Sequence, residues 1–427
     1  MGRGSIRPMA AQAQSPAPVA PDTITTDAGA LDTGAIDTLW SGPTTGFRGA
    51  SFAPDNSCFV VVGAGGCVTL YRKKTEKAWK TLWKQVVSGA TDALPGPDGK
   101  VVLAYAAMDP TRQYVTFIQH VHSSTTTPLA SGEREVPKDQ PTPSAGAGEV
   151  TLCRFILDGA IWDATLSADG HRAAIVTGGH SLYLFTLDDT PTYRRLTVKG
   201  TGDSIAISQD GSYLASGTWD ESGVSCYKKD GSLLWRYPDD VDPSGTIVNR
   251  LFEARIAKDS PYVLGVSYAN VDQGNATVYL WRKSSASPRW IYRLGPDDSD
   301  PQAMIAANGS YVAVTYAHRL LHGNKSAQER LLVLLDRYGA GGFGHEVWPH
   351  PRGGLLMSPT LVAISPDGDT ITVTDGQRKI YTYDSDGRIS APAKTMTALI
   401  HQTIPSDDGR YVLVYTGDGQ LTLVKPV

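Results

Sequence analysis

Two short acidic segments contain the residues in this sequence that are best able to do chemistry. The segments share the pattern Pro-Asp-Asp-x-Asp-Pro, and each follows an apolar stretch that contains a tryptophan. Their carboxylates are those of Asp239, Asp240, Asp242, Asp297, Asp298 and Asp300. Carboxylate oxygens could coordinate calcium, and a group of them also attracts a basic protein surface. The structural alternative is that proline and aspartate serve here as turn residues in solvated linkers.

A predicted loop at Trp219 is the second candidate site. Trp219 is followed by Asp220 and Glu221, and an aromatic side chain with a polar rim is typical of the anchor residue of a protein interface. The alternative is that this tryptophan packs beneath its own loop. A loop of the same kind contains Arg378. We therefore predict a partner-binding surface made of these four residues and the two acidic segments.

Other motif matches fail on their sequence context. Residues 339–344 fit Gly-x-Gly-x-x-Gly, but no helix follows whose N-terminus could hold a pyrophosphate. Residues 345–350 contain two histidines at the wrong spacing for a zinc-protease motif, and a proline there would break the required helix. His318 and His322 lie in a predicted loop over residues 318–329, where a separation of four has no helical meaning. We therefore predict no cofactor. Calcium binding at the acidic segments is the metal site that we keep as an alternative.

Short elements must position these residues, because chain-breaking residues occur throughout the sequence. The 427 residues include 44 glycines and 27 prolines, which leaves little room for a helical bundle. A hydrophobic content of 41% and a charged content of 19% are normal for a soluble globular protein. A net charge of -4 gives no general attraction to phosphate backbones, and no apolar run could span a membrane. We therefore predict no nucleic-acid partner and no membrane insertion.

An internal repeat predicts the fold. Its clearest copy, residues 204–237, contains four short strands separated by turns, and the Asp-Gly of the first turn supplies the positive φ that a tight turn needs. Equivalent first turns lie at Asp55, Asp98, Asp169, Asp210, Asp259, Asn308, Asp367 and Asp408. Apart from two longer gaps, the turns recur about every 40 to 50 residues, the length of a four-stranded β-propeller blade.

The ends of the chain predict how the ring closes. Eight turns indicate eight blades, and seven is the alternative if one weak unit is not a blade. The last unit offers only three strands, and residues 36–41 resemble the outer strand at residues 233–237, so we expect them to complete the last blade. This gives an all-β protein with one propeller over residues 35–427. A leader over residues 1–34, either disordered or the remnant of a secretory signal, and a surface-loop insertion at residues 122–148 complete the predicted organisation.

Tryptophan and cysteine positions predict a packed core rather than a reactive site. The residues Trp83, Trp235, Trp290 and Trp348 recur in or near predicted outer strands. This recurrence is more typical of packing between blades than of ligand stacking. The four cysteines show no Cys-x-x-Cys pair, which weakens both a zinc site and a redox motif. We expect buried, inert thiols.

The repeat resembles the WD40-like and PQQ-like families of bacterial and archaeal β-propellers. The Ser-Pro-Asp-Gly turns and the segment at residues 230–237 carry the resemblance, which covers residues 36–427. No blade has the complete Gly-His to Trp-Asp signature of eukaryotic WD40 repeats. The PQQ-like resemblance implies a quinoprotein dehydrogenase as one alternative, although the adjacent cysteines common in such enzymes are missing. A propeller hydrolase with a central metal is the other enzymatic alternative.

The predicted blade order places the candidate residues together. In a propeller, the connections between blades open on the same face as the connections between second and third strands. That face would carry Trp219, Arg378 and both acidic segments. We therefore predict a non-catalytic binding scaffold or sensor domain that engages a protein or polymer partner there, as a monomer or as a component of a modular assembly. The compartment stays open, although residues 9–21 look like the small-residue end of a secretory signal and favour an extracytoplasmic location.

Overall fold

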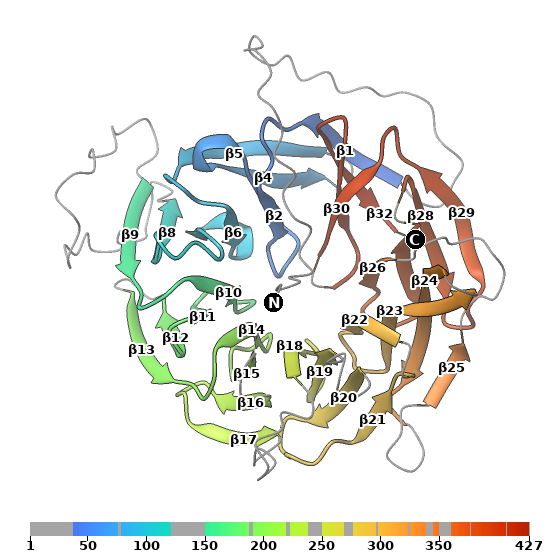
Figure 1. Cartoon of the computed structure of the whole chain (residues 1–427). Coiled ribbons are helices and arrows are strands. Elements are labelled where there is room, and N and C mark those ends of the chain that lie inside the picture. The colour runs from blue at the N-terminus through green and yellow to red at the C-terminus, as the bar shows by residue number, and fades with distance from the viewer. Residues whose placement is uncertain are drawn as a thin grey trace.

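The turns that recur along the sequence each join two antiparallel strands, and the strands form four-stranded sheets arranged in a ring (Figure 1). The computed structural model describes residues 37–75, 78–120, 150–187, 191–218, 223–237, 250–268, 276–295, 298–322, 325–338, 345–349, 360–375, 377–406 and 408–426. Within these residues, eight sheets form the blades of one β-propeller. The eight-blade prediction is confirmed, rather than its seven-blade alternative. The predicted leader and the insertion at residues 122–148 lie outside the described residues.

Each blade is an antiparallel meander that runs from an inner strand to an outer one. Blades 1 to 4 consist of β2 (Gly49–Phe52), β3 (Cys58–Val62), β4 (Cys67–Thr75) and β5 (Ala78–Val86); β6 (Asp92–Pro95), β7 (Val101–Tyr105), β8 (Tyr114–His120) and β9 (Val150–Ile156); β10 (Ile161–Leu166), β11 (Arg172–Thr177), β12 (Ser181–Thr186) and β13 (Thr192–Thr197); β14 (Gly202–Ile207), β15 (Tyr213–Thr218), β16 (Gly223–Lys228) and β17 (Leu233–Tyr237).

Blades 5 to 8 follow the same order. They consist of β18 (Arg250–Ile256), β19 (Tyr262–Tyr268), β20 (Thr277–Arg282) and β21 (Trp290–Arg293); β22 (Asp298–Ile305), β23 (Tyr311–His322), β24 (Lys325–Asp336) and β25 (His345–Pro349); β26 (Thr360–Ile364), β27 (Thr370–Thr374), β28 (Lys379–Asp384) and β29 (Ile389–Thr395); β30 (Ile400–Pro405), β31 (Val412–Thr416), β32 (Gln420–Lys425) and β1 (Asp37–Pro43). Two single-turn 3-10 helices, η1 (Ala64–Gly66) and η2 (Pro97–Gly99), lie in blades 1 and 2.

A recurring side-chain arrangement explains why the first turns form. In blade 4, Ser208 Oγ donates to Asp210 Oδ1 at 2.6 Å and accepts from the backbone N–H of Tyr213 at 3.0 Å. We call this arrangement the serine–aspartate clamp. Blades 3, 7 and 8 have the same clamp, with serine–aspartate distances of 2.5, 2.6 and 2.8 Å. All eight predicted first turns lie between an inner strand and the next strand of its blade, as expected.

The first strand of the chain closes the ring. β1 pairs antiparallel with β32, so it is the outer strand of blade 8. The hydroxyl oxygens of Ser41 and Thr422 lie 3.2 Å apart, and the N–H of Thr44 donates to the carbonyl of Gly419 at 2.9 Å. The prediction that residues 36–41 complete the last blade is confirmed, because β1 pairs with β32 in the same sheet.

The core lies between neighbouring blades. Trp290 is fully buried in the cluster between blades 5 and 6, and Trp235 and Trp83 are also buried, which confirms their predicted place in the core.

The thiols of Cys58 and Cys226 are buried too, and burial raises the pKa of each to about 12. No disulfide forms among the four cysteines. The Cys58 and Cys226 thiols therefore stay protonated at neutral pH, as predicted, whereas Cys67 and Cys153, which were also predicted to be buried, are only half-buried.

The main departure from the prediction is in blade 6. The segment at residues 318–329, predicted as a loop, continues β23 and β24 as a hairpin in which His318 pairs with Glu329 and His322 with Lys325. The physical reason is visible in the sequence, because neither strand contains glycine or proline and the Gly-Asn dipeptide between them is a hairpin signal.

No helix in the described part of the chain is long and apolar enough to cross a membrane.

Candidate binding surface

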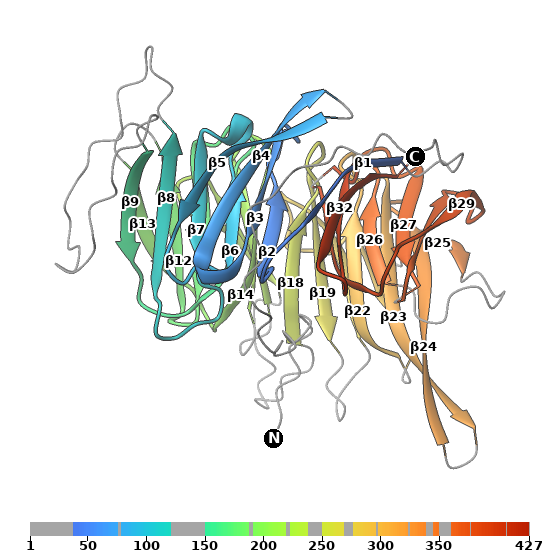
Figure 2. The same cartoon turned by 90° about the horizontal axis from the view of Figure 1, so that it is seen from above.

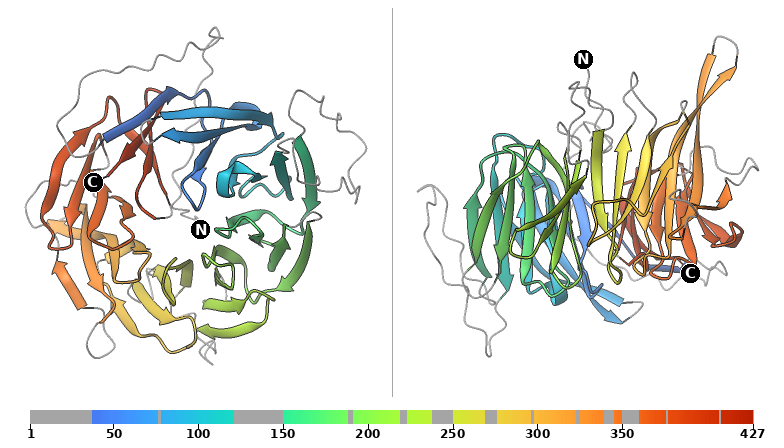
Figure 3. Two further views of the ribbon diagram at one scale, coloured as in Figure 1. Left: turned by 180° about the vertical axis from the view of Figure 1, so that it is seen from behind. Right: turned by 90° about the horizontal axis from the view of Figure 1, so that it is seen from below.

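The connections of a four-stranded meander alternate between the two faces of the disc. We call the face with the first turns the turn face, and the opposite face, which carries the connections between second and third strands and between blades, the loop face. The β23–β24 hairpin projects from the loop face, whereas the β4–β5 hairpin projects from the turn face (Figures 2 and 3). The loop face is where the sequence predicted a partner-binding surface.

Asp298 is the best-defined of the predicted aspartates. It was expected in the connection between blades 5 and 6, but it is the first residue of inner strand β22 and pairs across the sheet with His318. Asp298 Oδ1 lies 2.7 Å from His318 Nδ1, and Asp298 Oδ2 accepts from the N–H of Gly295 at 2.6 Å. Only 9% of Asp298 is exposed. Its carboxylate therefore holds the start of β22 and orients the imidazole.

Asp300 follows in the same strand with a different environment. It lies at the irregularity where the β22–β23 pairing shifts between Ser299 and Gln302, and its φ is +50°. Aspartate tolerates this left-handed conformation better than most residues. The side chain is half-buried. Of the two described aspartates in this segment, Asp300 is the more open to a partner.

Arg378 is presented by a rigid turn of blade 7, between β27 and β28. Asp375 Oδ1 accepts three backbone hydrogen bonds, from Gln377, Arg378 and Lys379, at 2.8, 2.9 and 3.0 Å. The carbonyl of Arg378 accepts from the N–H of Met396 at 2.7 Å. The backbone is thus fixed while the Arg378 side chain is exposed. Among the described residues its guanidinium forms no ion pair, so it is presented to a partner.

Seven of the predicted site residues lie outside the described part of the chain. They are Trp219, Asp220, Glu221, Asp239, Asp240, Asp242 and Asp297. Their participation in a common surface with Arg378 and Asp300 stays a prediction. Among the residues that the structure does describe, no group of three His, Cys, Asp or Glu side chains could hold a metal ion.

A polar network around Asp158, between blades 2 and 3, was not found by sequence reasoning. Thr177 Oγ1 and Ser181 Oγ donate to the carboxylate at 2.9 and 2.5 Å, and Arg195 forms an ion pair with it. Partial burial opposes ionisation, but these hydrogen bonds and the arginine outweigh it, so the pKa of Asp158 lies below its ordinary value. The partners come from three strands, and no local pattern in the sequence brings them together.

The central channel contains a cavity of about 390 Å³. All eight inner strands, or the turns that follow them, contribute to its lining, which contains both polar and apolar side chains. Three of its charged side chains, those of Asp163, Glu253 and Arg255, contact other groups of the propeller. Glu253 forms an ion pair with Arg255, and Asp163 accepts backbone hydrogen bonds from Ala164 and Ile205 at 2.9 and 3.0 Å. The Asp163 contacts join blades 3 and 4 around the channel.

Comparisons with known proteins support the fold and no particular activity. No family model matches the sequence, and no curated protein matches it. Among solved structures, the chain is similar to a chain of Kuenenia stuttgartiensis hydrazine synthase, with a TM-score of 0.53 and 12% sequence identity. The match covers 95% of this chain and 99% of the other. At that identity the likeness shows the β-propeller fold alone, which serves many unrelated functions.

Proposed function

We propose that this protein is a non-catalytic binding scaffold or sensor domain that engages a protein partner through its loop face. The observation that carries the proposal is the β23–β24 hairpin. Each of its strands has 12 residues, and the pairing of β23 with inner strand β22 stops at His318. Beyond that residue, within the described part of the chain, the hairpin is a two-stranded ribbon that projects from the disc (Figure 2).

Such a ribbon is suited to a protein partner for a physical reason. Both of its edges present backbone N–H and C=O groups that no neighbouring described strand pairs, and an extended peptide can add to such an edge as a further strand. An isolated two-stranded hairpin is only marginally stable in water. Binding would therefore satisfy the edge and order the ribbon together.

Charged groups on the same face would add specificity. Arg378 in blade 7 and Asp300 in blade 6 are neighbours in blade order, and we propose that the acidic segments and Trp219 extend this surface as the sequence predicts. We further infer that the blades are WD40-like or PQQ-like repeats of a prokaryotic protein, since the serine–aspartate clamp supports the motif that carried this resemblance. Calcium at the acidic segments stays part of the proposal for titration calorimetry to test.

The experiment removes the projecting ribbon and keeps the blade. Residues 319–328 are replaced by Asn-Gly, which leaves His318 and Glu329 paired across a two-residue turn. The parent protein captures partners from its native source, and the purified partner is then titrated into parent and variant by calorimetry. We expect the dissociation constant to rise at least tenfold in the shortened variant, and severalfold in Arg378→Glu.

A matched control lies in the same blade as Arg378. Arg388 is exposed at the opposite, turn face, between β28 and β29, so Arg388→Glu should leave the affinity unchanged. A partner that binds the shortened variant as tightly as the parent would refute the proposed function. Uptake of PQQ with a new absorption band, or tightly bound metal in the purified protein, would favour the enzymatic alternatives instead.

A further inference from the structure

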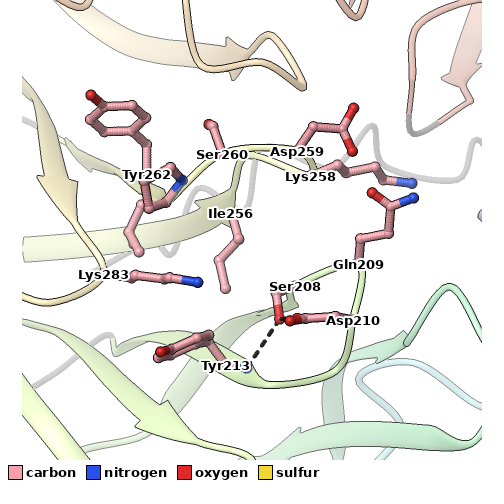
Figure 4. A pocket seen from close by; sticks show the side chains of 12 residues that line it. Ser208, Gln209, Asp210, Tyr213, Ile256, Lys258, Asp259, Ser260, Tyr262 and Lys283 are labelled. Carbon is pink, nitrogen blue, oxygen red and sulfur yellow. Dashed lines mark hydrogen bonds between the residues drawn. The ribbon is translucent and has the colours of Figure 1, made fainter.

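A cavity of about 380 Å³ opens on the turn face between blades 4 and 5. Figure 4 shows its lining side chains, which come from the first turns of both blades and from the end of β20. Tyr213, Ile256, Pro261 and Tyr262 supply apolar surface. Its volume lies within the range of small-molecule sites, which usually combine apolar walls with a few polar groups.

The first turn of blade 5 lacks the serine–aspartate clamp of its neighbour. In blade 4, Asp210 accepts hydrogen bonds from Ser208 Oγ and from both the N–H and Oγ of Ser212. In blade 5, Ala257 stands where the clamp serine would be. The carboxylate of Asp259 is exposed and has no hydrogen-bond partner among the described residues. The fold does not use this negative charge.

Lys283 provides a charge of the opposite sign, close enough to Asp210 to help lower the pKa of that carboxyl. Its ammonium lies 3.9 Å from the centroid of the Tyr213 ring and forms no ion pair with a described carboxylate. The equivalent lysine of blade 1, Lys73, instead donates to the hydroxyl of Tyr411 at 2.8 Å. Figure 4 shows Lys283 and Asp259 on opposite sides of the cavity, with Ile256 between them.

We propose that this cavity binds a small zwitterion whose two charges are separated by an apolar spacer, such as an ω-amino acid. The ligand carboxylate would contact Lys283, its ammonium would contact Asp259, and its spacer would pack on Tyr213, Ile256 and Pro261. The site is on the opposite face from the proposed partner surface, so it is an additional activity and does not depend on the proposed function.

The test compares ligands that share a six-carbon chain and differ in charge. Ligand-observed NMR titrations of the full chain use 6-aminohexanoate, hexanoate and hexylamine, with 4-aminobutanoate and 8-aminooctanoate to vary the spacer. Binding of 6-aminohexanoate or 8-aminooctanoate should be saturable and about fivefold tighter than that of either singly charged six-carbon ligand, because each exposed ion pair adds little.

Two substitutions should each remove one half of this preference. Lys283→Met should abolish the advantage of the zwitterion over hexylamine, and Asp259→Asn should abolish its advantage over hexanoate. Lys229→Met, at the blade 4 position equivalent to Lys283, is the matched control and should change neither. Ala257→Ser should rebuild the clamp, engage Asp259 and weaken zwitterion binding in the same way as Asp259→Asn.

Each outcome decides the proposal. Charge-selective binding that follows these variants supports it, and an unchanged melting temperature in Lys283→Met excludes misfolding as the cause of a loss. The absence of saturable binding for all three amino acids would overturn it. Equal loss of all ligands in the two variants, or an effect of Lys229→Met as large as that of Lys283→Met, would also overturn it.

Discussion

The two faces of this propeller use their polar residues differently. On the turn face, four blades close their first turns with the same serine–aspartate clamp, and hydrogen bonds within the turn satisfy the aspartates. On the loop face the connections differ from blade to blade, one hairpin projects from the disc, and the exposed Arg378 is held on a rigid turn without an ionic partner among the described residues. In the repeated turns, polar side chains bond to the turn itself. In the connections that differ between blades, polar side chains stay available for binding.

The first turn of blade 5 shows that the difference comes from side-chain chemistry and not only from location. It lies on the turn face, yet it lacks the clamp serine and leaves Asp259 without a described partner. The cavity beside it is the place on that face where we propose a ligand. Substitutions at matched positions of the two faces, or of blades 4 and 5, test this interpretation.

The largest effect is expected from a turn-face glycine. Gly409 has φ of +71°, and a Cβ atom there would lie 2.0 Å from the carbonyl oxygen of Ile364. Gly409→Ala should lower the free energy of unfolding by about 3 kcal/mol or more, since the left-handed conformation alone costs about 1–2 kcal/mol. Gly419, on the loop face, has φ of +81° with nothing near its Cβ. Urea denaturation should show a clearly smaller loss for Gly419→Ala; equal losses would contradict the steric argument.

The next effect is expected from the clamp itself. Ser208→Ala removes a donor to Asp210 and the acceptor for the N–H of Tyr213, which should cost about 1–3 kcal/mol because partly buried polar groups lose their partners. Asp259→Asn in blade 5 removes no hydrogen bond to a described residue and should change stability by less than about 0.5 kcal/mol. If the denaturation curves of the two variants coincide, the clamp does not stabilise the turn.

A smaller effect should appear as a pH dependence. Partial burial opposes ionisation of Asp210, but hydrogen bonds from Ser208 and Ser212 and the nearby Lys283 lower its pKa from 3.8 to about 2. A lowered pKa means that the ionised carboxylate stabilises the fold above about pH 3.8 and that this contribution is lost as the pH falls toward 2. Because the group is exposed, we expect less than about 1 kcal/mol.

The measurement for Asp210 is denaturation at a series of pH values. Asp210→Asn should be less stable than the parent at pH 5, and the gap should narrow as the pH falls to 2. A gap that stays constant across that range would show that the carboxylate charge is not what stabilises the turn.

The smallest effect on stability is expected on the loop face. Arg378→Glu changes an exposed side chain without a described ionic partner, so the free energy of unfolding should shift by less than about 0.5 kcal/mol. The same substitution should weaken partner binding severalfold. Thermal unfolding and calorimetry together check this separation, and a large loss of stability would mean that Arg378 belongs to the fold.

Much of the fold could be predicted from the sequence because the turns repeat. An Asp-Gly turn, or in three blades a variant of it, follows each inner strand. The blade order, the eight blades and the closing strand β1 could therefore be predicted. The hairpin in blade 6 was missed because the longer strands depart from the length of the repeat, although the Gly-Asn dipeptide was a usable signal. Periodicity predicts what blades share and gives little guidance where one blade differs.

The candidate sites were harder to predict for a related reason. Asp298 belongs to an acidic sequence motif, but its carboxylate contacts His318, twenty residues further along the chain. Lys283 and Asp259 belong to different strands and turns of one blade, and nothing in their spacing shows that they share a cavity with Tyr213 of the previous blade. Such groupings depend on how neighbouring blades pack, which local sequence patterns do not encode.

Hydrogen–deuterium exchange of the protein with and without its captured partner tests the division between the faces most directly. We predict slower exchange in the partner-bound state at residues 316–331, in the projecting hairpin, and at residues 377–379 around Arg378. The first turns at residues 208–213 and 365–370 should exchange at the same rate in both states. Protection of those turns, with no change in the hairpin, would contradict the account.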